Sequence, residues 1–283
     1  MDWDRIKTIF IVTFFVLDLF LIFQFIQKQD SNQLELIAET KIDQELKANK
    51  ITMGNIPKEP KKESFIRAEN KAFKEEDIQS LKNQTVQTVH IQNMYKIESK
   101  LKEPFLNTKS LSKDKYNEFL KNYVLDGQKY EFGAVKDSKI YFFQKYKDKP
   151  IFYNNQAMIV VELNEKNELV SYTQTMLTDL KEMGEGEKTK EQEIITAQTA
   201  LENLYLKNKI HGNTHVKEAQ IGYATLTAST SNNQVLAPTW NLKTEQKQDF
   251  FVNAIEGQVM ELGEKENQVV DEHTGVRKNG VAF

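Results

Sequence analysis

A long, predominantly apolar stretch near the N-terminus constrains this chain more than any other feature. Residues 8–26 read Thr-Ile-Phe-Ile-Val-Thr-Phe-Phe-Val-Leu-Asp-Leu-Phe-Leu-Ile-Phe-Gln-Phe-Ile, with Asp18 as their one charged residue. As a helix they would extend about 28 Å, close to the thickness of the hydrocarbon core of a bilayer. The sequence after Ile26 is hydrophilic. We therefore expect residues 1–28 to form a short tip and one transmembrane anchor that holds a large domain at the membrane surface.

The flanking charges predict the orientation of this anchor. Arg5 and Lys7 precede the apolar stretch, and only Lys28 follows it closely. The positive-inside bias places the N-terminus in the cytoplasm and the C-terminal domain outside the cell membrane. A cleaved signal peptide is the competing interpretation, but the stretch is long for one and no Ala-x-Ala-like site follows Ile26. A lipoprotein anchor is excluded because the chain has no cysteine.

Asp18 is a costly residue for such a helix. An acid at the centre of a membrane helix costs roughly 2.5–3.5 kcal/mol on insertion scales. Its neighbours three and four residues away, Phe14, Phe15, Leu21 and Ile22, are all apolar, so no polar stripe suggests a pore. A single polar group on an apolar helix suits contact with a partner helix. We predict that Asp18, Phe14, Leu21 and Ile22 form this contact; the alternative is a protonated Asp18 that hydrogen-bonds its own helix.

The remainder of the chain carries nearly balanced charge. Of the 38 basic and 41 acidic residues, 36 and 38 lie outside residues 1–26. This balance argues against nucleic acid as a partner, since binding it requires a clustered basic excess. The chain is long enough for one large or two small domains beyond the anchor, and without disulfides their stability must come from apolar burial.

The pattern of helices and strands predicts an α+β fold in which one arrangement occurs twice. A stalk helix over 31–49 and strands over 65–72 and 85–94 fall in a first segment, 29–110. A helix over 112–124 opens the segment 111–180, and a helix over 189–207, with Thr189 and Gln192 as a capping box, lies in the segment 181–283. Strands are expected after the first helix at 129–135, 139–146, 151–152, 157–163 and 169–176, and after the second at 217–226, 234–242, 249–254 and 258–262.

Two short fragments support an internal repeat. Pro150-Ile-Phe152 and Pro238-Thr-Trp240 are 88 residues apart, and each precedes a hairpin pattern. Proline belongs at the start or edge of a strand. We expect both prolines at strand starts, with the following aromatic residue in the core, and two copies of a helix packed on an antiparallel meander. Chance similarity between short hairpins is the alternative.

The sequence contains no recognisable catalytic or metal-binding constellation. His-Glu-x-x-His, Gly-x-Ser-x-Gly, P-loop and dinucleotide-binding motifs are all missing from it. His211 and His215 are close in sequence, but Gly212 and Asn213 between them favour a surface turn over a metal site. We therefore expect a protein that is not an enzyme and that has no cofactor and no metal ion.

Specific segments at both ends resemble a known family. The opening Met-Asp-Trp-Asp-Arg-Ile-Lys-Thr-Ile-Phe-Ile, followed by Leu17-Asp-Leu-Phe20 and Gln24-Phe25, resembles the start of the YycI family, regulators of the WalRK (YycFG) two-component system. Pro238-Thr-Trp240 and Val252-Asn-Ala-Ile-Glu-Gly-Gln-Val259 resemble the last strands of PepSY-type domains. Chain length, a single N-terminal span and the lack of cysteine agree with the YycI resemblance.

The resemblance implies a membrane protein of Gram-positive bacteria that works beside YycH and modulates the sensor histidine kinase WalK, and through it cell-wall metabolism. In that interpretation the transmembrane helices carry the regulatory contact, and Asp18 is a candidate for it. The alternative is a tethered extracellular PepSY-like module that binds a peptide, a protease or a wall component, with the span acting only as an anchor in the lipid bilayer. The sequence specifies no oligomeric state.

Overall fold

The computed structural model describes residues 3–54, 62–91, 93–107, 113–136, 138–185, 188–226 and 232–263. Its helices are α1 (Trp3–Ala48), α2 (Glu75–Ile78), α3 (Lys113–Tyr123), the 3-10 turn η2 (Gly127–Lys129) and α4 (Ala197–Leu206). Its strands are β1 (Thr52–Met53), β2 (Lys62–Glu63), β3 (Ile66–Asn70), β4 (Gln84–Ile91), β5 (Met94–Asn107), β6 (Tyr130–Lys136), β7 (Lys139–Tyr146), β8 (Lys149–Pro150), β9 (Met158–Leu163), β10 (Glu168–Gln174), β11 (Leu177–Glu182), β12 (Gly184–Glu185), β13 (Lys188–Thr189), β14 (Gln192–Glu193), β15 (His215–Thr225), β16 (Asn233–Thr244), β17 (Asp249–Asn253) and β18 (Val259–Met260).

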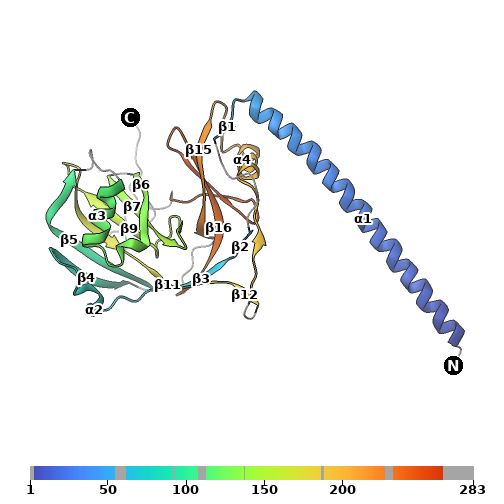
Figure 1. Ribbon diagram of the computed structural model, residues 1–283, viewed down its shortest axis with the longest axis horizontal. Coiled ribbons are helices and arrows are strands. Elements are labelled where there is room, and N and C mark those ends of the chain that lie inside the picture. Colours follow the sequence, from blue (N-terminus) through green and yellow to red (C-terminus); the bar gives the residue numbers. More distant parts are fainter. Residues whose placement is uncertain are drawn as a thin grey trace, which may run out of the picture.

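The described strands form two large sheets that lie side by side, with α1 projecting away from them (Figure 1). The α3 sheet, named for its covering helix, has the order β4-β5-β10-β9-β7-β6, with β8 added to β7. The α4 sheet has the order β1-β15-β16-β17-β18, with β3 joining β16 to β11. The expected α+β class is therefore confirmed, as a mixed domain with two sheets.

The α3 sheet is built as the sequence predicts, from a helix followed by an antiparallel meander. β6, β7, β9 and β10 follow α3 along the chain and pair in that order. The apolar face of α3 inserts Phe119, Leu120 and Val124 into the core of this sheet. On β7, Ile140 and Phe142 face this core, because side chains two residues apart lie on the same side of a strand.

The α4 sheet repeats this plan. β15, β16, β17 and β18 follow α4 and pair in order. The core beneath α4 takes apolar residues from the helix and from the segment just before it: Ile194, Ile195, Ala197, Ala200, Leu201, Leu204 and Tyr205.

The second helix begins eight residues later than the predicted start at Thr189. α4 begins at Ala197, and its N-cap is Thr196, whose hydroxyl accepts a hydrogen bond of 3.0 Å from the Thr199 amide. Thr189 and Gln192 instead lie in the short strands β13 and β14. Their capping-box pattern is overridden because β14 pairs with β2, which requires an extended backbone.

The two prolines of the proposed repeat occupy different positions. Pro150 ends the two-residue strand β8, and Phe152 beyond it is buried. Pro238 lies inside β16 rather than at a strand start, although Trp240 is buried as expected. One edge of β16 pairs with β3 through residue 236 and with β17 from residue 239. Pro238 falls in the gap between these two partners. No strand pairs with this edge at that point, so the N–H that proline lacks is not needed for a hydrogen bond between strands.

The N-terminal strands contribute to both sheets. β3 belongs to the α4 sheet, whereas β4 and β5 belong to the α3 sheet. The 14-residue strand β5 was not predicted from the sequence, because its many charged residues are typical of an exposed loop. In the structure these charged residues alternate along the strand and lie on one face of a long hairpin with β4. The division into segments 29–110, 111–180 and 181–283 stays a prediction.

The chain crosses back between the sheets from β10 to β11, and side chains fix this crossover. The Gln144 side chain acts like a strand neighbour: its Nε2 donates to the Leu177 carbonyl (2.8 Å) and its Oε1 accepts from the Leu177 amide (2.7 Å). The Tyr130 hydroxyl donates to the Thr175 carbonyl at 2.5 Å. Around the crossover, residues of the α4 sheet and two residues next to β8 and β9 form one buried cluster, against which Tyr146 of β7 packs: Ile66, Ala68, Ile151, Ala157, Leu177, Tyr223 and Leu236.

α1 is one continuous helix from Trp3 to Ala48, so the stalk helix expected over 31–49 continues from the predicted anchor. Among the described residues, no helix meets the length and hydropathy needed to cross a membrane. The predicted span at 8–26, of which residues 9 and 23–26 have no described side chains, therefore stays a prediction.

Replacing Gln144 by Leu should destabilise the fold through the crossover. The substitution leaves the buried N–H and C=O of Leu177 without partners, and we expect a loss of about 2–4 kcal/mol in the free energy of unfolding. Denaturant unfolding of the full chain in detergent measures it. Gln128→Leu, at an exposed position of η2, is the matched control and should change stability by less than about 0.5 kcal/mol. Equal losses for both variants would contradict this role of Gln144.

The buried tyrosines should make the fold sensitive to alkaline pH. Burial raises the pKa of Tyr172 to about 12, and burial also raises the pKa values of Tyr130 and Tyr223. Because the folded pKa exceeds the unfolded value near 10, the stabilisation is fully present below pH 10 and is lost as pH rises towards 12.

For Tyr172 alone we expect a loss of roughly 1 kcal/mol between pH 9 and pH 11. The measurement is the unfolding free energy at both pH values, with Tyr172→Phe as the comparison. The Phe variant should lose less stability than the wild type over this interval, and an identical pH dependence would contradict the assignment.

Candidate functional site

The structure places the four predicted partner-contact residues on one exposed face of α1. Asp18 is exposed, and the exposed fractions of Phe14, Leu21 and Ile22 are 57%, 51% and 54%. Offsets of three and four residues put all four side chains on the same side of a helix. Every residue from Phe10 to Ile22 is exposed, so this part of α1 presents an almost wholly apolar surface that the sheets do not cover.

The C-terminal end of α1, in contrast, is anchored in the core beneath α4. Lys50 has a positive φ of 55°, the Ile51 amide donates to the Leu46 carbonyl (2.8 Å), and the Lys50 amide donates to the Lys47 carbonyl (3.0 Å). This is a Schellman motif, and the apolar contact that accompanies it joins Leu46 to Ile51. Both residues are 3% exposed and belong to the α4 core. The helix end and the strand that follows are therefore fixed to the domain.

Polar contacts reinforce this junction between α1 and α4. Gln198 on α4 donates to the Asp43 carboxylate at 3.0 Å. The Tyr205 hydroxyl donates to Glu45 at 3.2 Å and accepts from the Asn49 amide group at 3.0 Å. We call the contacts of residues 42–51 with α4 the α1–α4 junction. It links the exposed helix directly to the second sheet.

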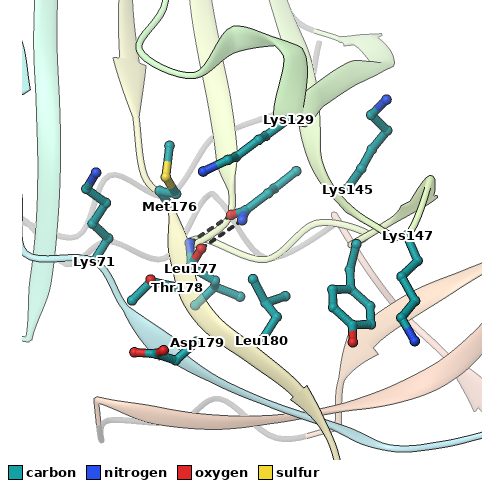
Figure 2. A pocket seen from close by; sticks show the side chains of 11 residues that line it. Lys71, Lys129, Lys145, Lys147, Met176, Leu177, Thr178, Asp179 and Leu180 are labelled. Atoms are coloured by element: carbon teal, nitrogen blue, oxygen red, sulfur yellow. Dashed lines mark hydrogen bonds between the residues drawn. The ribbon is translucent and has the colours of Figure 1, made fainter.

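A second feature is a cleft of about 390 Å³ between the ends of β7 and β11 (Figure 2). Its walls come from Gln144–Lys147 and from Met176–Leu180, together with Lys71 and Lys129. β11 carries a register shift here, and Asp179 has a positive φ of 50°. The segment therefore bulges, which opens the space between the two strands.

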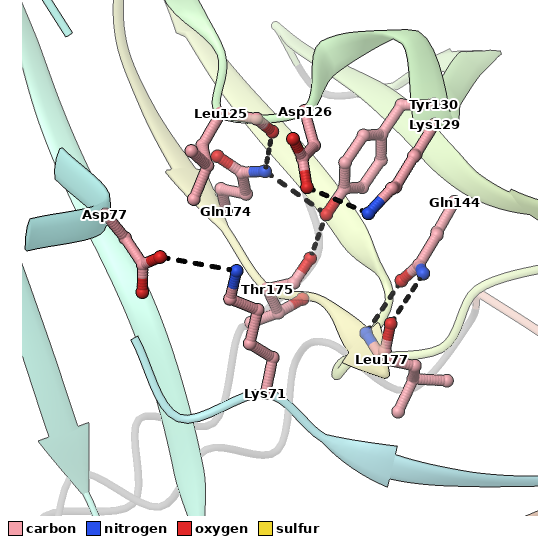
Figure 3. A network of polar contacts seen from close by, with 10 residues as sticks. All are labelled: Lys71, Asp77, Leu125, Asp126, Lys129, Tyr130, Gln144, Gln174, Thr175 and Leu177. Atoms are coloured by element: carbon pink, nitrogen blue, oxygen red, sulfur yellow. Dashed lines mark hydrogen bonds and ion pairs between the residues drawn. The ribbon is translucent and has the colours of Figure 1, made fainter. Parts of the chain in front are cut away.

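The lysines that line this cleft already have acidic partners. Lys71 contacts Asp77 at 3.6 Å, Lys129 contacts Asp126 at 2.8 Å, Lys145 contacts Asp148 at 3.6 Å and Lys147 contacts Glu182 at 2.5 Å. Figure 3 shows two of these pairs beside the hydrogen bonds that hold the crossover. Because the positive charges are neutralised locally, the cleft has no excess charge that would select an anion.

A partly buried ion pair lies where β2, β8 and β15 meet. The Lys149 ammonium contacts the two carboxylate oxygens of Glu63 at 2.6 and 2.7 Å, and the Tyr223 hydroxyl donates to the same carboxylate at 3.1 Å. Burial, followed by the charge of Glu63, raises the pKa of the Tyr223 phenol. These contacts join strands from different parts of the chain and fit a structural role, since every charge is paired.

Among the described residues, no group of three or more His, Asp or Glu side chains lies close enough together to hold a metal ion. His90 stacks on Tyr95 with ring centroids 4.2 Å apart, and His215 Nδ1 lies 2.7 Å from the Thr52 hydroxyl. His211 lies at a turn, apart from any acidic partner that the structure describes, and His273 lies outside the described residues.

The sequence predicts the exposed face of α1 around Asp18, whose role as a partner contact stays a prediction, but it predicts neither the junction nor the cleft. One local pattern in the sequence indicates the junction: the apolar residues Leu46 and Ile51 flank a polar helix end, as in a Schellman motif. No local pattern indicates the cleft, since its lysines come from three separate segments of the chain.

Comparison with known proteins identifies the family. The family model described as YycI protein matches residues 31–255. The chain belongs to the YycI family. It shares 12% identity with an uncharacterized protein from Eubacterium rectale ATCC 33656, over 75% of this chain and 89% of that one, at a TM-score of 0.40. The Bacillus megaterium YpeB C-terminal domain is also 12% identical, over 66% of this chain and 93% of that one, at a TM-score of 0.34. No curated protein sequence matches the chain significantly.

Membership of the YycI family carries general functional consequences. YycI-family proteins are membrane-anchored, non-enzymatic regulatory proteins. Membership also implies regulation associated with WalK and association with WalK and YycH. The expected absence of catalysis agrees with this family.

Truncating Leu46 to Ala should weaken the α1–α4 junction. Removal of a side chain that is 3% exposed creates a cavity in the α4 core, and we expect a loss of about 2–4 kcal/mol in the free energy of unfolding. Leu206→Ala on α4 is the matched control, because Leu206 is 55% exposed. Denaturant unfolding measures both variants, and a Leu46→Ala loss no larger than that of the control would contradict the anchoring of α1.

Proposed function

We propose that this protein is a membrane-anchored regulator of the WalK sensor histidine kinase that acts with YycH through transmembrane and extracellular contacts and so tunes cell-wall metabolism signalling. The observation that carries the proposal is the continuity of α1. One helix presents an exposed apolar face at residues 10–22 and ends in the α1–α4 junction. A contact made by the exposed part is therefore mechanically connected to the domain.

In this proposal residues 8–26 span the membrane once, with the N-terminus in the cytoplasm and both sheets outside the cell. Arg5 and Lys7 favour that orientation. The exposed apolar side chains then face lipid or neighbouring helices, in the environment that suits them. The junction lies at the end of α1 that leaves the membrane, next to the extracellular domain.

Asp18 is the proposed contact point in the membrane. An acid on an apolar helix lowers its insertion cost when it hydrogen-bonds to a group on another helix. Phe14, Leu21 and Ile22 surround it on the same face and supply the packing. A coupling of roughly 1–3 kcal/mol between this contact and the kinase is enough to shift a two-state signalling equilibrium.

Membrane co-purification tests the regulatory contact. Tagged full-length protein should recover WalK and YycH from the membrane, and Asp18→Leu should reduce their recovery by at least about fivefold, the equivalent of ~1 kcal/mol. Thr13→Leu is the matched control: it also replaces a polar residue by leucine, but lies about 140° around the helix from Asp18.

The outcomes of this experiment separate the parts of the proposal. Recovery reduced by Asp18→Leu but not by Thr13→Leu supports the helix contact. Unchanged recovery with both variants moves the contact to the extracellular domain, and recovery of neither partner with the wild type contradicts the proposed function.

The cleft supports a second candidate function, a tethered PepSY-like module that binds an extracellular peptide, protease or wall component. Ligand sites commonly combine an apolar lining with a few polar groups, and the mixed lining of this cleft, with its lysines paired to acids, suits an uncharged group. Replacing residues 8–26 by an unrelated span distinguishes the candidates. The module should tolerate the exchange without change in kinase output, whereas the helix-contact regulator should lose regulation.

A further inference from the structure

Trp3 and Lys7 form an exposed pair at the N-terminal end of α1. The Lys7 ammonium lies over the Trp3 indole, 5.5 Å from the ring centroid. Trp3 is 67% exposed, and this end of α1 is remote from the two sheets (Figure 1). A cation is attracted to the face of an aromatic ring, and more strongly where water is scarce. The described part of the domain leaves this pair uncovered, so its environment lies outside the domain.

The position of Trp3 in the sequence is typical of an interfacial residue. It is the only tryptophan or tyrosine before Tyr95, and phenylalanine is the only aromatic residue of the stretch 8–26. Tryptophan and tyrosine gather where a membrane meets water, because their rings are apolar while their N–H or O–H groups need a polar partner. Trp3 precedes the predicted span by five residues, which is where such a residue is expected.

The side chain of Lys7 is directed toward the N-terminus of the helix. Lys7 follows Trp3 by four residues, yet its ammonium reaches the Trp3 ring. A lysine near the end of a membrane helix adopts this direction when its methylene groups stay along apolar surface and its charge extends to the headgroups. The pair therefore brings an indole and an ammonium to the same level of the helix axis.

We propose that Trp3 and Lys7 bind the lipid headgroup layer of the cytoplasmic leaflet and so fix the depth of α1 in the bilayer. The proposal rests on the transmembrane orientation of the function proposed above. The indole N–H and the ammonium are both donors, and lipid phosphates supply the acceptors. The four charged residues among the first seven, two acidic and two basic, sum to zero. General attraction to anionic lipid is therefore not the cause of this binding.

An anchor at this level explains why Asp18 needs a partner. Asp18 follows Trp3 by fifteen residues, which is about 22 Å along a helix axis. The headgroup layer lies roughly 15–22 Å from the bilayer midplane. With Trp3 in that layer, Asp18 lies within about 7 Å of the midplane, where a charge is most costly. A free helix could slide until Asp18 reached water, whereas an anchored helix leaves a hydrogen bond to another helix as the remaining relief.

Depth-dependent fluorescence quenching locates Trp3. The full-length protein is reconstituted in phosphatidylcholine vesicles whose acyl chains carry bromine at one defined position. Trp240, the other tryptophan, is buried in the α4 core, so bromine in the bilayer should not quench it. We expect stronger quenching from bromine near the headgroup than near the chain end, and no quenching in Trp3→Leu. Quenching that is absent in the wild type, or strongest at the chain end, overturns the proposal.

Cysteine labelling in cell membranes tests the fixed depth, because the chain has no natural cysteine. Gln24→Cys, near the outer end of the predicted span, should be protected from a membrane-impermeant maleimide added outside. Adding Trp3→Leu and Lys7→Gln should raise its labelling at least about fivefold, because the released helix slides outward and carries Asp18 toward water. Phe10→Leu is the matched control: it removes an aromatic ring within the span and should leave the labelling unchanged.

The outcomes separate this proposal from the proposed function. Labelling of Gln24→Cys that does not rise with Trp3→Leu and Lys7→Gln contradicts the depth anchor and leaves the span intact. Equal labelling of Gln24→Cys and Gln29→Cys with the natural tip would contradict the span itself, and with it the proposed function. If the increase does occur, Asp18→Leu in the same variant should restore protection, because it removes the drive to slide. Labelling that stays high with Asp18→Leu would contradict the link between the anchor and Asp18.

Discussion

The interlocking of the two sheets is the constraint on which the remaining structure depends. The chain enters the α4 sheet at β1 and adds β3 to it, moves to the α3 sheet at β4 and β5, and returns to the α4 sheet at β11. One buried cluster of the α4 sheet, which contains Leu177 and Tyr223, packs against Tyr146 of β7 and against Ile151 and Ala157 beside β8 and β9. A second shared cluster joins Phe143 and Phe152 to Phe251, with ring centroids 5.2 Å apart for Phe152 and Phe251. Separation of the sheets would expose both clusters to water, so the domain is held as one body.

This interlocking determines how α1 is connected to the domain. Leu46 and Ile51 belong to the core beneath α4, and the same sheet shares its inner clusters with the α3 sheet. A force on either sheet therefore reaches the end of α1 through packed side chains. Interiors as dense as these transmit displacement because they offer little free volume to absorb it. The α1–α4 junction is for this reason the place where a change in the domain and a change in the helix are coupled.

The sequence predicted local structure well where periodicity and burial agree. The meanders after α3 and α4 were predictable because their strands alternate or are apolar throughout, and neighbouring strands are joined by short turns. The helix at 189–207 was predicted too long because a capping pattern at Thr189 competes with the pairing of β14 to β2, which is a long-range contact. Long-range pairing also explains why β11 and the role of β3 were not predicted. β3 pairs with β11 and β16, which lie over a hundred residues further along the chain.

The candidate site was only partly predictable for a related reason. The face around Asp18 follows from helical spacing alone, so the sequence specifies it completely. Gln144 gave no such signal, since an amide in a strand usually faces solvent. Its importance comes from the Leu177 backbone that the crossover brings to it. Buried polar side chains that replace a strand neighbour can be recognised only when the topology is known.

The position of the exposed apolar face of α1 has a thermodynamic consequence under the proposed function. This face and the α3 sheet lie at different ends of one connected body (Figure 1). If the binding of a partner to the domain changes the affinity of α1 for its partner helices, those helices must change the binding of that partner by the same factor. Such reciprocity requires a packed path between the two places. The shared clusters and the α1–α4 junction provide that path, and disruption of either should uncouple the two binding events.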